Sequence, residues 1–317
     1  MPKPVVLLYE PIHEKALELL RQSAEVRLAD SLEEDALLKI VPDVDGIIIR
    51  ANGKVSRRLM QAAPHLKVVA RHGTGVEAID RVAAANLGIV VVNTPDANVE
   101  SVAEQCLAFM IILSKRILLA DRMFRAGDWS ARYKLTGTEP YGKILGIIGF
   151  GRIGRRTAEM CHAALDMPVL YFDELDYPEV EAQLGSRKVV LDDLLHLSDY
   201  VSIHLPLLPT TQRIINAAAL YKMKRTAFLI NTSRGQVVDQ AALIQALQEG
   251  WIAGAGLDVY DPEPLPPDNP LLTMDNVVLS PHMAAHTDEA LFRMAMVIED
   301  VLNVIEGRPV QNPVPPP

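Results

Sequence analysis

The stretch GIIGFGRIGRR, residues 146–156, completes an apolar run and leads directly into a helical pattern. Its glycines Gly149, Gly151 and Gly154 have the GxGxxG spacing of a strand–turn–helix that binds dinucleotides. The first glycine permits a tight turn, the second lets the backbone approach a pyrophosphate, and the third permits close helix–strand packing. The spacing alone is common in proteins. Here a helix is expected directly after it, and the N–H groups at the start of a helix attract phosphate. Together they predict a Rossmann-type cofactor site.

A second signal for the cofactor is Asp173, which ends the next apolar run at 168–172. An acidic residue about 20 positions beyond the glycines accepts hydrogen bonds from ribose hydroxyls. Its negative charge also repels a 2′-phosphate, so the sequence predicts NAD as the cofactor in preference to NADP. The alternative is an ordinary strand–helix turn with a helix-capping acid, which the combined glycine and carboxylate pattern disfavours.

Short β-branched runs alternate with helical patterns along the whole chain, which indicates parallel sheets covered on both faces. The sequence predicts an α/β fold with two doubly wound parallel sheets. The first lobe is expected to cover 1–98 and to take back 287–317, and the second to cover 99–286. The expected strands are 5–9, 26–29, 46–50, 66–70 and 89–93 in the first lobe, and 143–150, 168–172, 188–191, 200–205, 227–231, 253–258 and 277–280 in the second. The expected helices include a long one over about 98–126 and a last one over about 287–306.

Composition narrows the class of protein. The 317 residues are 49% hydrophobic and carry a formal net charge of −9, so a nucleic-acid partner is not expected. The two cysteines, Cys106 and Cys161, lie in apolar helical patterns without metal-type spacing. We therefore expect no metal site and a reducing compartment, the cytoplasm. We also expect no signal peptide and no membrane segment, because every apolar run is too short to span a bilayer.

Polar residues follow several strands of the second lobe, where ligands of open parallel sheets bind. Three of them suit acid–base work on a keto acid: Arg234 after one strand, Glu263 in a proline-rich loop, and His282 at the end of VVLSPH. A carboxylate beside histidine favours its protonated form, and arginine binds carboxylates or polarises a carbonyl. With NAD, the set suggests hydride transfer to a ketone beside a carboxylate. Spacing alone does not show that these three side chains lie close together. The alternatives are therefore a structural role for Arg234, a surface position for Glu263, and a His282 that only hydrogen-bonds to a neighbouring residue.

The first lobe carries candidate anion-binding residues at its own strand ends. The turn Gly73–Thr74–Gly75 offers N–H groups that form an anion nest. Arg50 either holds a second anionic group or is an ordinary surface arginine, and the sequence favours neither.

Several motifs in this order resemble the D-isomer-specific 2-hydroxyacid dehydrogenases over essentially the whole chain. They are SVAEQCLAFM, GFGRIGRR, NTSRGQVVDQAAL, GAGLDVYDPEPLPPDNPLL and VVLSPHMAAHT. The resemblance implies a Rossmann NAD-binding domain inserted in a flavodoxin-like substrate domain. It also implies that Arg234 orients the substrate, that His282 donates the proton and that Glu263 supports His282.

The same resemblance implies further contacts. The expected cofactor contacts are Thr74, Val102, Gly149, Gly151, Arg152, Ile153, Gly154, Asp173, Leu205, Pro206, Thr232, Ser233, Asp258, Ala284 and Ala285. The expected substrate contacts are Arg50, Arg71, His72, Gly73, Thr74 and Gly75. A homodimer formed through the long helix after residue 98 is implied as well.

Within the family, IIIRANGKV and VVARHGTGVEAID look most like phosphoglycerate dehydrogenases, with Arg50 and Arg71 holding a phosphate or carboxylate. Two features depart from that pattern: His72 replaces a small residue, and the chain ends at Pro317 without the regulatory domain. The substrate is thus 3-phosphoglycerate or another 2-hydroxy acid, with hydroxypyruvate or glyoxylate reduction as the alternative. A non-enzymatic NAD-binding scaffold, similar to corepressors of this fold, is the alternative from a different class.

Overall fold

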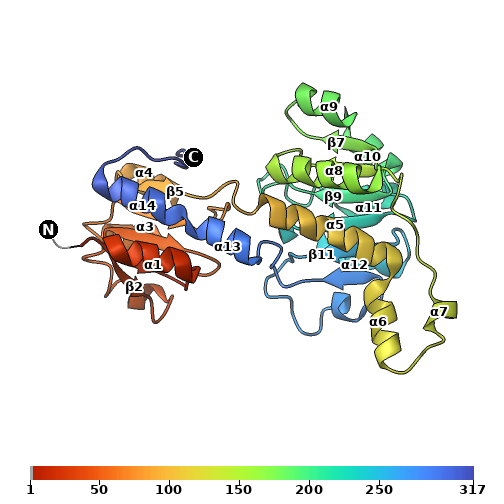
Figure 1. Ribbon diagram of the computed structural model, residues 1–317, viewed down its shortest axis with the longest axis horizontal. Coiled ribbons are helices and arrows are strands. Elements are labelled where there is room, and N and C mark those ends of the chain that lie inside the picture. The colour runs from red at the N-terminus through yellow and green to blue at the C-terminus, as the bar shows by residue number, and fades with distance from the viewer. Residues whose placement is uncertain (1–2) are drawn as a thin grey trace. The chain divides into compact units, whose positions relative to one another are not determined.

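The computed structural model describes residues 3–317, which divide into two compact units (Figure 1). Unit 1 is the chain up to Asn98 together with His286–Pro317, and unit 2 is Val99–Ala285. Unit 2 is thus inserted in the sequence of unit 1. The sequence placed His286 in the second lobe, whereas the structure groups it with unit 1, where its Nε2 lies 3.3 Å from Nη2 of Arg50.

Unit 1 contains a five-stranded, fully parallel sheet in the order β2-β1-β3-β4-β5. This is the flavodoxin-like order 2-1-3-4-5. The strands are β1 Val5–Leu8, β2 Glu25–Leu28, β3 Gly46–Ile49, β4 Val68–Arg71 and β5 Val90–Val92. All four residues of β1 and of β3 are buried, as expected for a parallel sheet covered on both faces.

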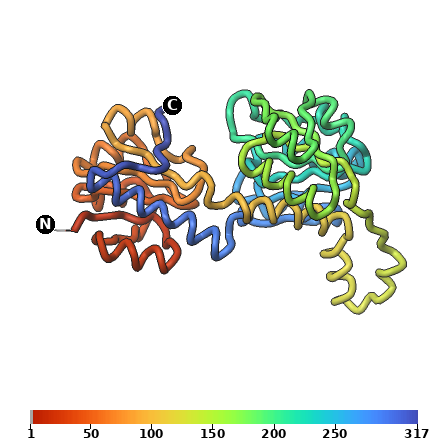
Figure 2. Tube along the Cα trace, turned by 45° about the horizontal axis from the view of Figure 1, so that its top comes forward, coloured from red at the N-terminus to blue at the C-terminus, as the bar shows by residue number. Residues whose placement is uncertain are grey.

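Helices cover both faces of this sheet. The helices of unit 1 are α1 Glu14–Ser23, α2 Glu34–Leu37, α3 Arg57–Gln61, α4 Arg81–Asn86, α13 Asp288–Ala295 and α14 Val297–Glu306. Leu7, Ile47 and Ile49 pack with α2, α3 and α4 on one face, while Val6 and Ile48 pack with α1 and α14 on the other. Figure 2 shows the blue C-terminal helices running beside the red and orange strands. The returning segment is therefore part of the unit 1 core.

Unit 2 contains a seven-stranded, fully parallel sheet in the order β12-β11-β10-β9-β6-β7-β8. Counted from its own first strand, the order is 3-2-1-4-5-6 with a seventh strand added, which is the Rossmann arrangement. The strands are β6 Leu145–Ile148, β7 Val169–Phe172, β8 Arg187–Lys188, β9 Tyr200–Ile203, β10 Phe228–Asn231, β11 Gly254–Leu257 and β12 Val277–Leu279. The order reverses between β6 and β9, and ligands of such sheets bind at this switch point.

The helices of unit 2 form the layers on either side of its sheet. They are α5 Val99–Lys115, α6 Ile117–Arg125, α7 Ala131–Lys134, α8 Arg152–Leu165, α9 Pro178–Leu184, α10 Leu191–Leu197, α11 Ala217–Lys222 and α12 Gln240–Gln248, with 3-10 turns at Gly235–Val237 and Pro270–Thr273. α5, α8 and α9 contribute to the core on one face, and α10, α11 and α12 to the core on the other. The predicted fold class, two doubly wound parallel α/β domains, is confirmed.

Two predicted helices are each divided in the structure. The helix expected over 98–126 ends at Lys115, because Arg116 adopts the left-handed conformation with φ 52° and a second helix, α6, starts after it. No side chain of α6 is buried, and α6 and α7 extend away from the sheet in both views (Figure 1, Figure 2). The helix expected over 287–306 is likewise interrupted at Met296, which ends α13 and precedes α14.

None of the helices in residues 3–317 combines the length and the apolar character needed to cross a lipid bilayer.

Candidate active site

The turn after β6 meets the geometric requirements of a dinucleotide-binding loop. Gly149 has φ 92°, and a Cβ at this position would lie 2.8 Å from the carbonyl oxygen of His204. A Cβ on Gly154 would lie 2.2 Å from the carbonyl oxygen of Gly149, so only glycine lets α8 pack this closely. Beside Gly151, apart from its chain neighbours, no heavy atom of the described residues lies within 4 Å of the Cβ position. That space is open to a ligand.

The start of α8 is suited to an anion. Gly151 is the N-cap residue, and no side chain of the described residues caps the helix there. The first N–H groups of a helix lack intrahelical acceptors and carry the positive end of the helix dipole. A pyrophosphate beside Gly151 would supply the missing acceptors, so the loop and the helix together fit a dinucleotide.

Asp173 follows β7, the strand that pairs with β6. Its Oδ2 accepts a hydrogen bond of 2.6 Å from the N–H of Phe150, within the glycine turn, and its Oδ1 accepts one of 2.9 Å from the N–H of Leu175. A carboxylate has about four acceptor positions, so both oxygens can still receive ribose hydroxyls. The position and the charge of Asp173 fit the adenosine ribose of NAD.

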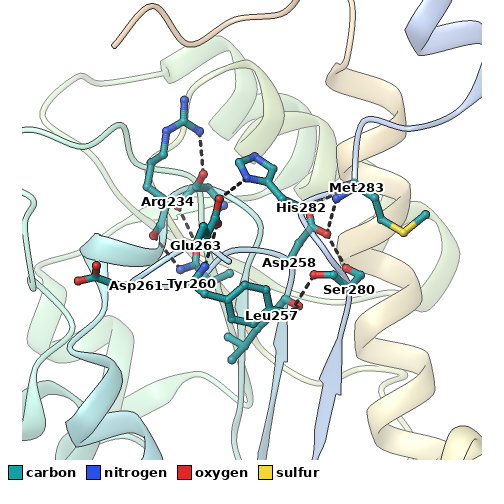
Figure 3. Close-up of polar contacts among 12 residues, drawn as sticks. Arg234, Leu257, Asp258, Tyr260, Asp261, Glu263, Ser280, His282 and Met283 are labelled. Carbon is teal, nitrogen blue, oxygen red and sulfur yellow. Dashed lines mark hydrogen bonds and ion pairs between the residues drawn. The ribbon is translucent and has the colours of Figure 1, made fainter. Parts of the chain in front are cut away.

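The structure brings Arg234, Glu263 and His282 together on unit 2 (Figure 3). Nδ1 of His282 lies 2.8 Å from Oε2 of Glu263, and Oε1 of Glu263 accepts a hydrogen bond of 3.0 Å from the N–H of Tyr260. The side chain of His282 is 53% exposed, so its ring remains accessible to a substrate. Because Glu263 is an acceptor, it favours the proton on Nδ1 and leaves Nε2 as the reactive nitrogen.

The backbone around His282 is held by a buried carboxylate. His282 has φ 51°, an unusual conformation for a residue other than glycine. Its N–H donates to the carbonyl oxygen of Asp258 over 2.8 Å. Asp258 is buried, with 1% of the residue exposed, and its carboxylate accepts from the N–H of Met283 (2.8 Å), the N–H of Ala284 (2.9 Å) and Oγ of Ser280 (2.5 Å). These bonds keep the imidazole at the edge of the sheet.

Arg234 lies in a turn that is tied to the Glu263 loop. Asn231, at the end of β10, donates from Nδ2 to the carbonyl oxygen of Arg234 over 2.9 Å. A Cβ on Gly235 would lie 1.8 Å from the carbonyl oxygen of Tyr260, whose N–H binds Glu263. The absence of a side chain at Gly235 therefore lets the two loops touch.

The pKa values of His282 and Glu263 are shifted in the directions that suit proton transfer by the histidine. The hydrogen bond to Glu263 raises the pKa of His282 above its ordinary value, although burial and the charge of Arg234 act against it. Burial would raise the pKa of Glu263, but the hydrogen bonds from His282 and Tyr260 and the nearby positive charges outweigh it and lower the pKa. A protonated histidine beside an ionised glutamate is thus favoured.

Comparison with known proteins agrees with this geometry. Residues 107–284 match the family model described as D-isomer specific 2-hydroxyacid dehydrogenase, NAD binding domain. The chain is 42% identical to D-3-phosphoglycerate dehydrogenase of Archaeoglobus fulgidus over 98% of its own length and 59% of that protein. It is 40% identical to glyoxylate reductase of Thermofilum pendens over 97% of its own length and 93% of that protein.

A solved structure of the TT0316 protein from Thermus thermophilus superimposes with a TM-score of 0.92 at 38% identity, covering 98% of this chain and all of that one.

The chain belongs to the D-isomer-specific 2-hydroxyacid dehydrogenase family.

Membership of this family gives unit 2 its role as the NAD-binding domain, and NAD is the cofactor. The remaining residues predicted to contact it lie around the carboxyl ends of the unit 2 strands. Leu205 and Pro206 come after β9, Thr232 and Ser233 after β10, Ala284 and Ala285 after His282, Val102 on α5, and Arg152 and Ile153 on the first turn of α8. Oγ of Ser101 donates to the carbonyl oxygen of Ala284 over 2.6 Å, which ties the start of α5 to the histidine loop.

The predicted substrate residues form a separate group on unit 1, and Thr74, also predicted to contact the cofactor, lies there too. Arg50 follows β3, and Arg71 ends β4, where its Cα pairs with that of Ile49. His72 is buried, and burial together with the charges of Arg50 and Arg71 lowers its pKa to about 4, so it is neutral. The N–H of Gly73 donates to Oγ1 of Thr94 and is not available to a ligand.

The expected nest is therefore smaller than the sequence suggested. Within residues 3–317, the N–H groups of Thr74 and Gly75 donate no hydrogen bond, so two donors remain instead of three. The carbonyl of Thr74 accepts from Nδ2 of Asn93 over 2.9 Å, which fixes the orientation of this turn.

Three residues that hold the loops around Arg234, Glu263 and His282 were not predicted from the sequence: Asn231, Tyr260 and Ser280. The hydroxyl of Tyr260 lies 3.0 Å from the carbonyl oxygen of Leu257 and 2.8 Å from that of Ser280, and so bridges the ends of β11 and β12. An asparagine directly before Thr–Ser–Arg–Gly is a turn signal that could have identified Asn231. Nothing in the local sequence indicates the partners of Tyr260 and Ser280.

The proton-donor role predicted for His282 can be tested through the pH dependence of activity. If the imidazolium donates a proton to a keto acid, kcat/KM for reduction is highest at low pH and falls as pH rises through the raised pKa of His282. Glu263→Gln removes the charge that raises this pKa, and the decline should move to lower pH. The matched control Asp268→Asn, at an exposed position in the same loop, should keep the wild-type profile. An unchanged profile for Glu263→Gln would contradict the pairing.

Proposed function

We propose that this protein is an NAD-dependent D-2-hydroxyacid dehydrogenase that interconverts a small 2-keto acid and the corresponding 2-hydroxy acid. The observation that carries the proposal is the His282–Glu263 pair, 2.8 Å apart, beside Arg234 on a Rossmann unit. This combines a proton donor, the group that keeps it protonated, and a cation for a carboxylate or carbonyl oxygen.

Each chain group has one task in the proposed reaction. The glycine turn at Gly149–Gly154 and Asp173 would hold NADH, which would supply the hydride for the carbonyl carbon. His282 donates a proton from Nε2 to the keto oxygen, and Glu263 stabilises the imidazolium through Nδ1. Arg234 orients the substrate and polarises its carbonyl. In the reverse direction, neutral His282 accepts the hydroxyl proton at Nε2.

On unit 1 we assign the N–H groups of Thr74 and Gly75 to the substrate carboxylate and Arg50 and Arg71 to a further anionic group. The similarity to a phosphoglycerate dehydrogenase and to a glyoxylate reductase makes 3-phosphoglycerate, hydroxypyruvate and glyoxylate the first compounds to assay.

A panel of 2-keto acids with NADH, followed by the absorbance of NADH, tests the activity. Oxidation of NADH that depends on one of these acids supports the proposal. A protein that binds NADH tightly but reduces none of them would instead favour the scaffold role.

The role of Asp173 in selecting NAD is tested by Asp173→Asn. The amide oxygen can still accept from the N–H of Phe150, but the charge that repels a 2′-phosphate is gone. We expect the ratio of kcat/KM with NADPH to that with NADH to rise by about tenfold or more, equivalent to about 1.4 kcal/mol. Glu179→Gln, an exposed charge change on α9, should leave the ratio unchanged. An unaltered ratio for Asp173→Asn would remove this assignment.

We also propose a homodimer formed through α5, α6 and the segment after them. α6 buries none of its side chains within the chain, and Ile117, Leu118, Phe124 and Trp129 are exposed, with the rings of Phe124 and Trp129 5.6 Å apart. Exposed apolar groups gathered on one element mark interaction surfaces. Phe124→Asp should convert the dimer to a monomer in light scattering, whereas Leu272→Asp, at another exposed apolar position of unit 2, should not. A monomeric wild type would contradict the proposal.

We further propose that the protein is located in the cytoplasm. Cys106 and Cys161 are both free and buried, which suits a reducing environment.

A further inference from the structure

On unit 1, the turn after β4 lies beside the segment that follows β5. The N–H of Thr94 donates to the carbonyl oxygen of Gly73 over 3.1 Å, and Nδ2 of Asn93 donates to the carbonyl oxygen of Thr74 over 2.9 Å. A carbonyl oxygen only accepts, so the amide nitrogen of Asn93 and not its oxygen faces Thr74. Two successive carbonyl groups of the turn therefore point toward residues 93–94.

The same two bonds set the direction of the N–H groups that are left for a ligand. In a planar trans peptide group the C=O and the N–H point in opposite directions. The carbonyl of Gly73 shares its peptide group with the N–H of Thr74, the carbonyl of Thr74 shares its group with the N–H of Gly75, and both groups are trans. Both N–H groups therefore point away from residues 93–94, which is the arrangement of a nest that binds an anion.

The two bonds differ in what supplies the donor. The bond to the Gly73 carbonyl comes from the backbone, whereas the bond to the Thr74 carbonyl comes from a side chain. Thr74 is exposed and Gly75 is partly exposed, and their N–H groups donate to no group of the described chain. The direction of the Gly75 donor thus depends on one side-chain amide, that of Asn93.

Asn93 is itself held from its other side by the C-terminal segment. Its N–H donates to the carbonyl oxygen of Asn312 over 3.3 Å. Asp300, a buried residue of α14, accepts from the N–H groups of Gln311 (2.7 Å) and Asn312 (3.0 Å) and from Nδ2 of Asn312 (3.2 Å). The carboxylate of Asp300 therefore fixes the segment that in turn fixes the backbone of Asn93.

We propose that Asn93 is a positioning residue for the carboxylate of the substrate, because it keeps the N–H of Gly75 directed at the carboxylate before the acid binds. The inference rests on the proposed function for the assignment of this turn to a substrate carboxylate. Donors that are already oriented bind an anion more tightly than donors that must be ordered during binding. Asn93 acts through the peptide group, since its amide nitrogen lies on the side of that group opposite to the N–H.

Substitutions at this position separate loss of the bond from reversal of the peptide group. Asn93→Ala removes the donor and leaves the peptide group free to turn, so KM for the keto acid should rise by about threefold to tenfold. Asn93→Asp has nearly the same shape but only accepts, so the N–H of Gly75 should turn toward it and be lost to the substrate. Loss of a hydrogen bond to a charged group corresponds to a rise in KM of about tenfold to a hundredfold. Asn93→Gln retains an amide donor on a longer side chain and should recover part of the loss.

The split between KM and kcat distinguishes positioning from a role in folding alone. Loss of binding that is equal in the ground state and the transition state raises KM and leaves kcat unchanged. A folding defect would instead lower Tm and the amount of active protein without changing KM. The matched control Asn86→Ala, at an exposed position of α4, should have the wild-type KM.

Calorimetry of the whole chain with NADH and oxamate gives a readout without turnover. Oxamate keeps the carboxylate of a 2-keto acid but has an amide in place of the ketone, so NADH does not reduce it. Its dissociation constant should rise from the wild type through Asn93→Ala to Asn93→Asp, in the same order as KM. The dissociation constant of NADH should stay the same in all three proteins.

Wild-type KM and wild-type oxamate affinity in both Asn93→Ala and Asn93→Asp would overturn the inference. The assay and the calorimetry together separate this result from failure of the proposed function. Keto-acid reduction with the same KM in all Asn93 variants leaves the dehydrogenase and removes the role of Asn93. Oxamate affinity that falls in the expected order, without reduction of any keto acid, supports the role of Asn93 and removes the dehydrogenase. A wild type that neither reduces a keto acid nor binds oxamate removes both.

Discussion

His282→Gln is expected to lower kcat for keto-acid reduction by about 10²–10⁴-fold, the usual contribution of a general acid. Glutamine can still hydrogen-bond to Glu263 but cannot supply a proton at neutral pH. Because the contacts of the glycine turn and of Asp173 do not involve His282, the dissociation constant of NADH should change little. Stopped-flow reduction assays and NADH fluorescence titrations measure the two quantities separately.

The matched control for this variant is His196→Gln, which changes an exposed histidine at the end of α10. It should retain wild-type kcat. If His282→Gln instead lost NADH binding in proportion to activity, the proton-donor assignment would be rejected, since the residue would then act through the cofactor.

Gly151→Ala is expected to raise the dissociation constant of NADH by about tenfold to a hundredfold. The added methyl would enter the space that is clear of other atoms beside the start of α8, where the pyrophosphate is expected. Loss of one charge-assisted hydrogen bond costs about 1.5–3 kcal/mol, which corresponds to that range. The Tm of the protein without cofactor should be close to that of the wild type, because the methyl meets no atom of the described residues.

Gly154→Ala provides the comparison within the same turn. Its Cβ would lie 2.2 Å from the carbonyl oxygen of Gly149, so this variant should lower the stability of the protein itself, by about 1–3 kcal/mol. A Gly151→Ala protein that binds NADH as tightly as the wild type would show that the pyrophosphate does not approach this turn.

Much of the fold follows from local patterns. Apolar runs such as residues 5–8 and 46–49 form buried parallel strands, because a run without polar positions is covered on both sides. The glycine turn was also predictable, because the GxGxxG spacing is read over six residues, although the atom that a Cβ at Gly149 would meet belongs to His204, after another strand. Strands at the edge of a sheet were less predictable. Of the strand expected over 188–191, only Lys188 joins the sheet, in the two-residue strand β8.

The breaks in the helices were not predictable from periodicity. Residues on both sides of Arg116 continue an apolar helical pattern, yet α6 buries nothing and departs from the line of α5. Hydrophobic spacing reports which face of a helix is apolar, and it is insensitive to a single residue that changes the direction of the chain.

By itself, the sequence predicted the two parallel sheets and the glycine turn, because these depend on side-chain type and short-range spacing, and it supplied Arg234, Glu263 and His282 as acid–base candidates. Only the tertiary structure decided which residues meet. Glu263 reaches His282 because the ends of β11 and β12 are adjacent, and Gly235 lets the Arg234 turn contact Tyr260. His286 pairs with Arg50 because the chain returns to unit 1 after unit 2 is complete. Contacts between residues distant in sequence arise from the packing of whole elements, which no local pattern encodes.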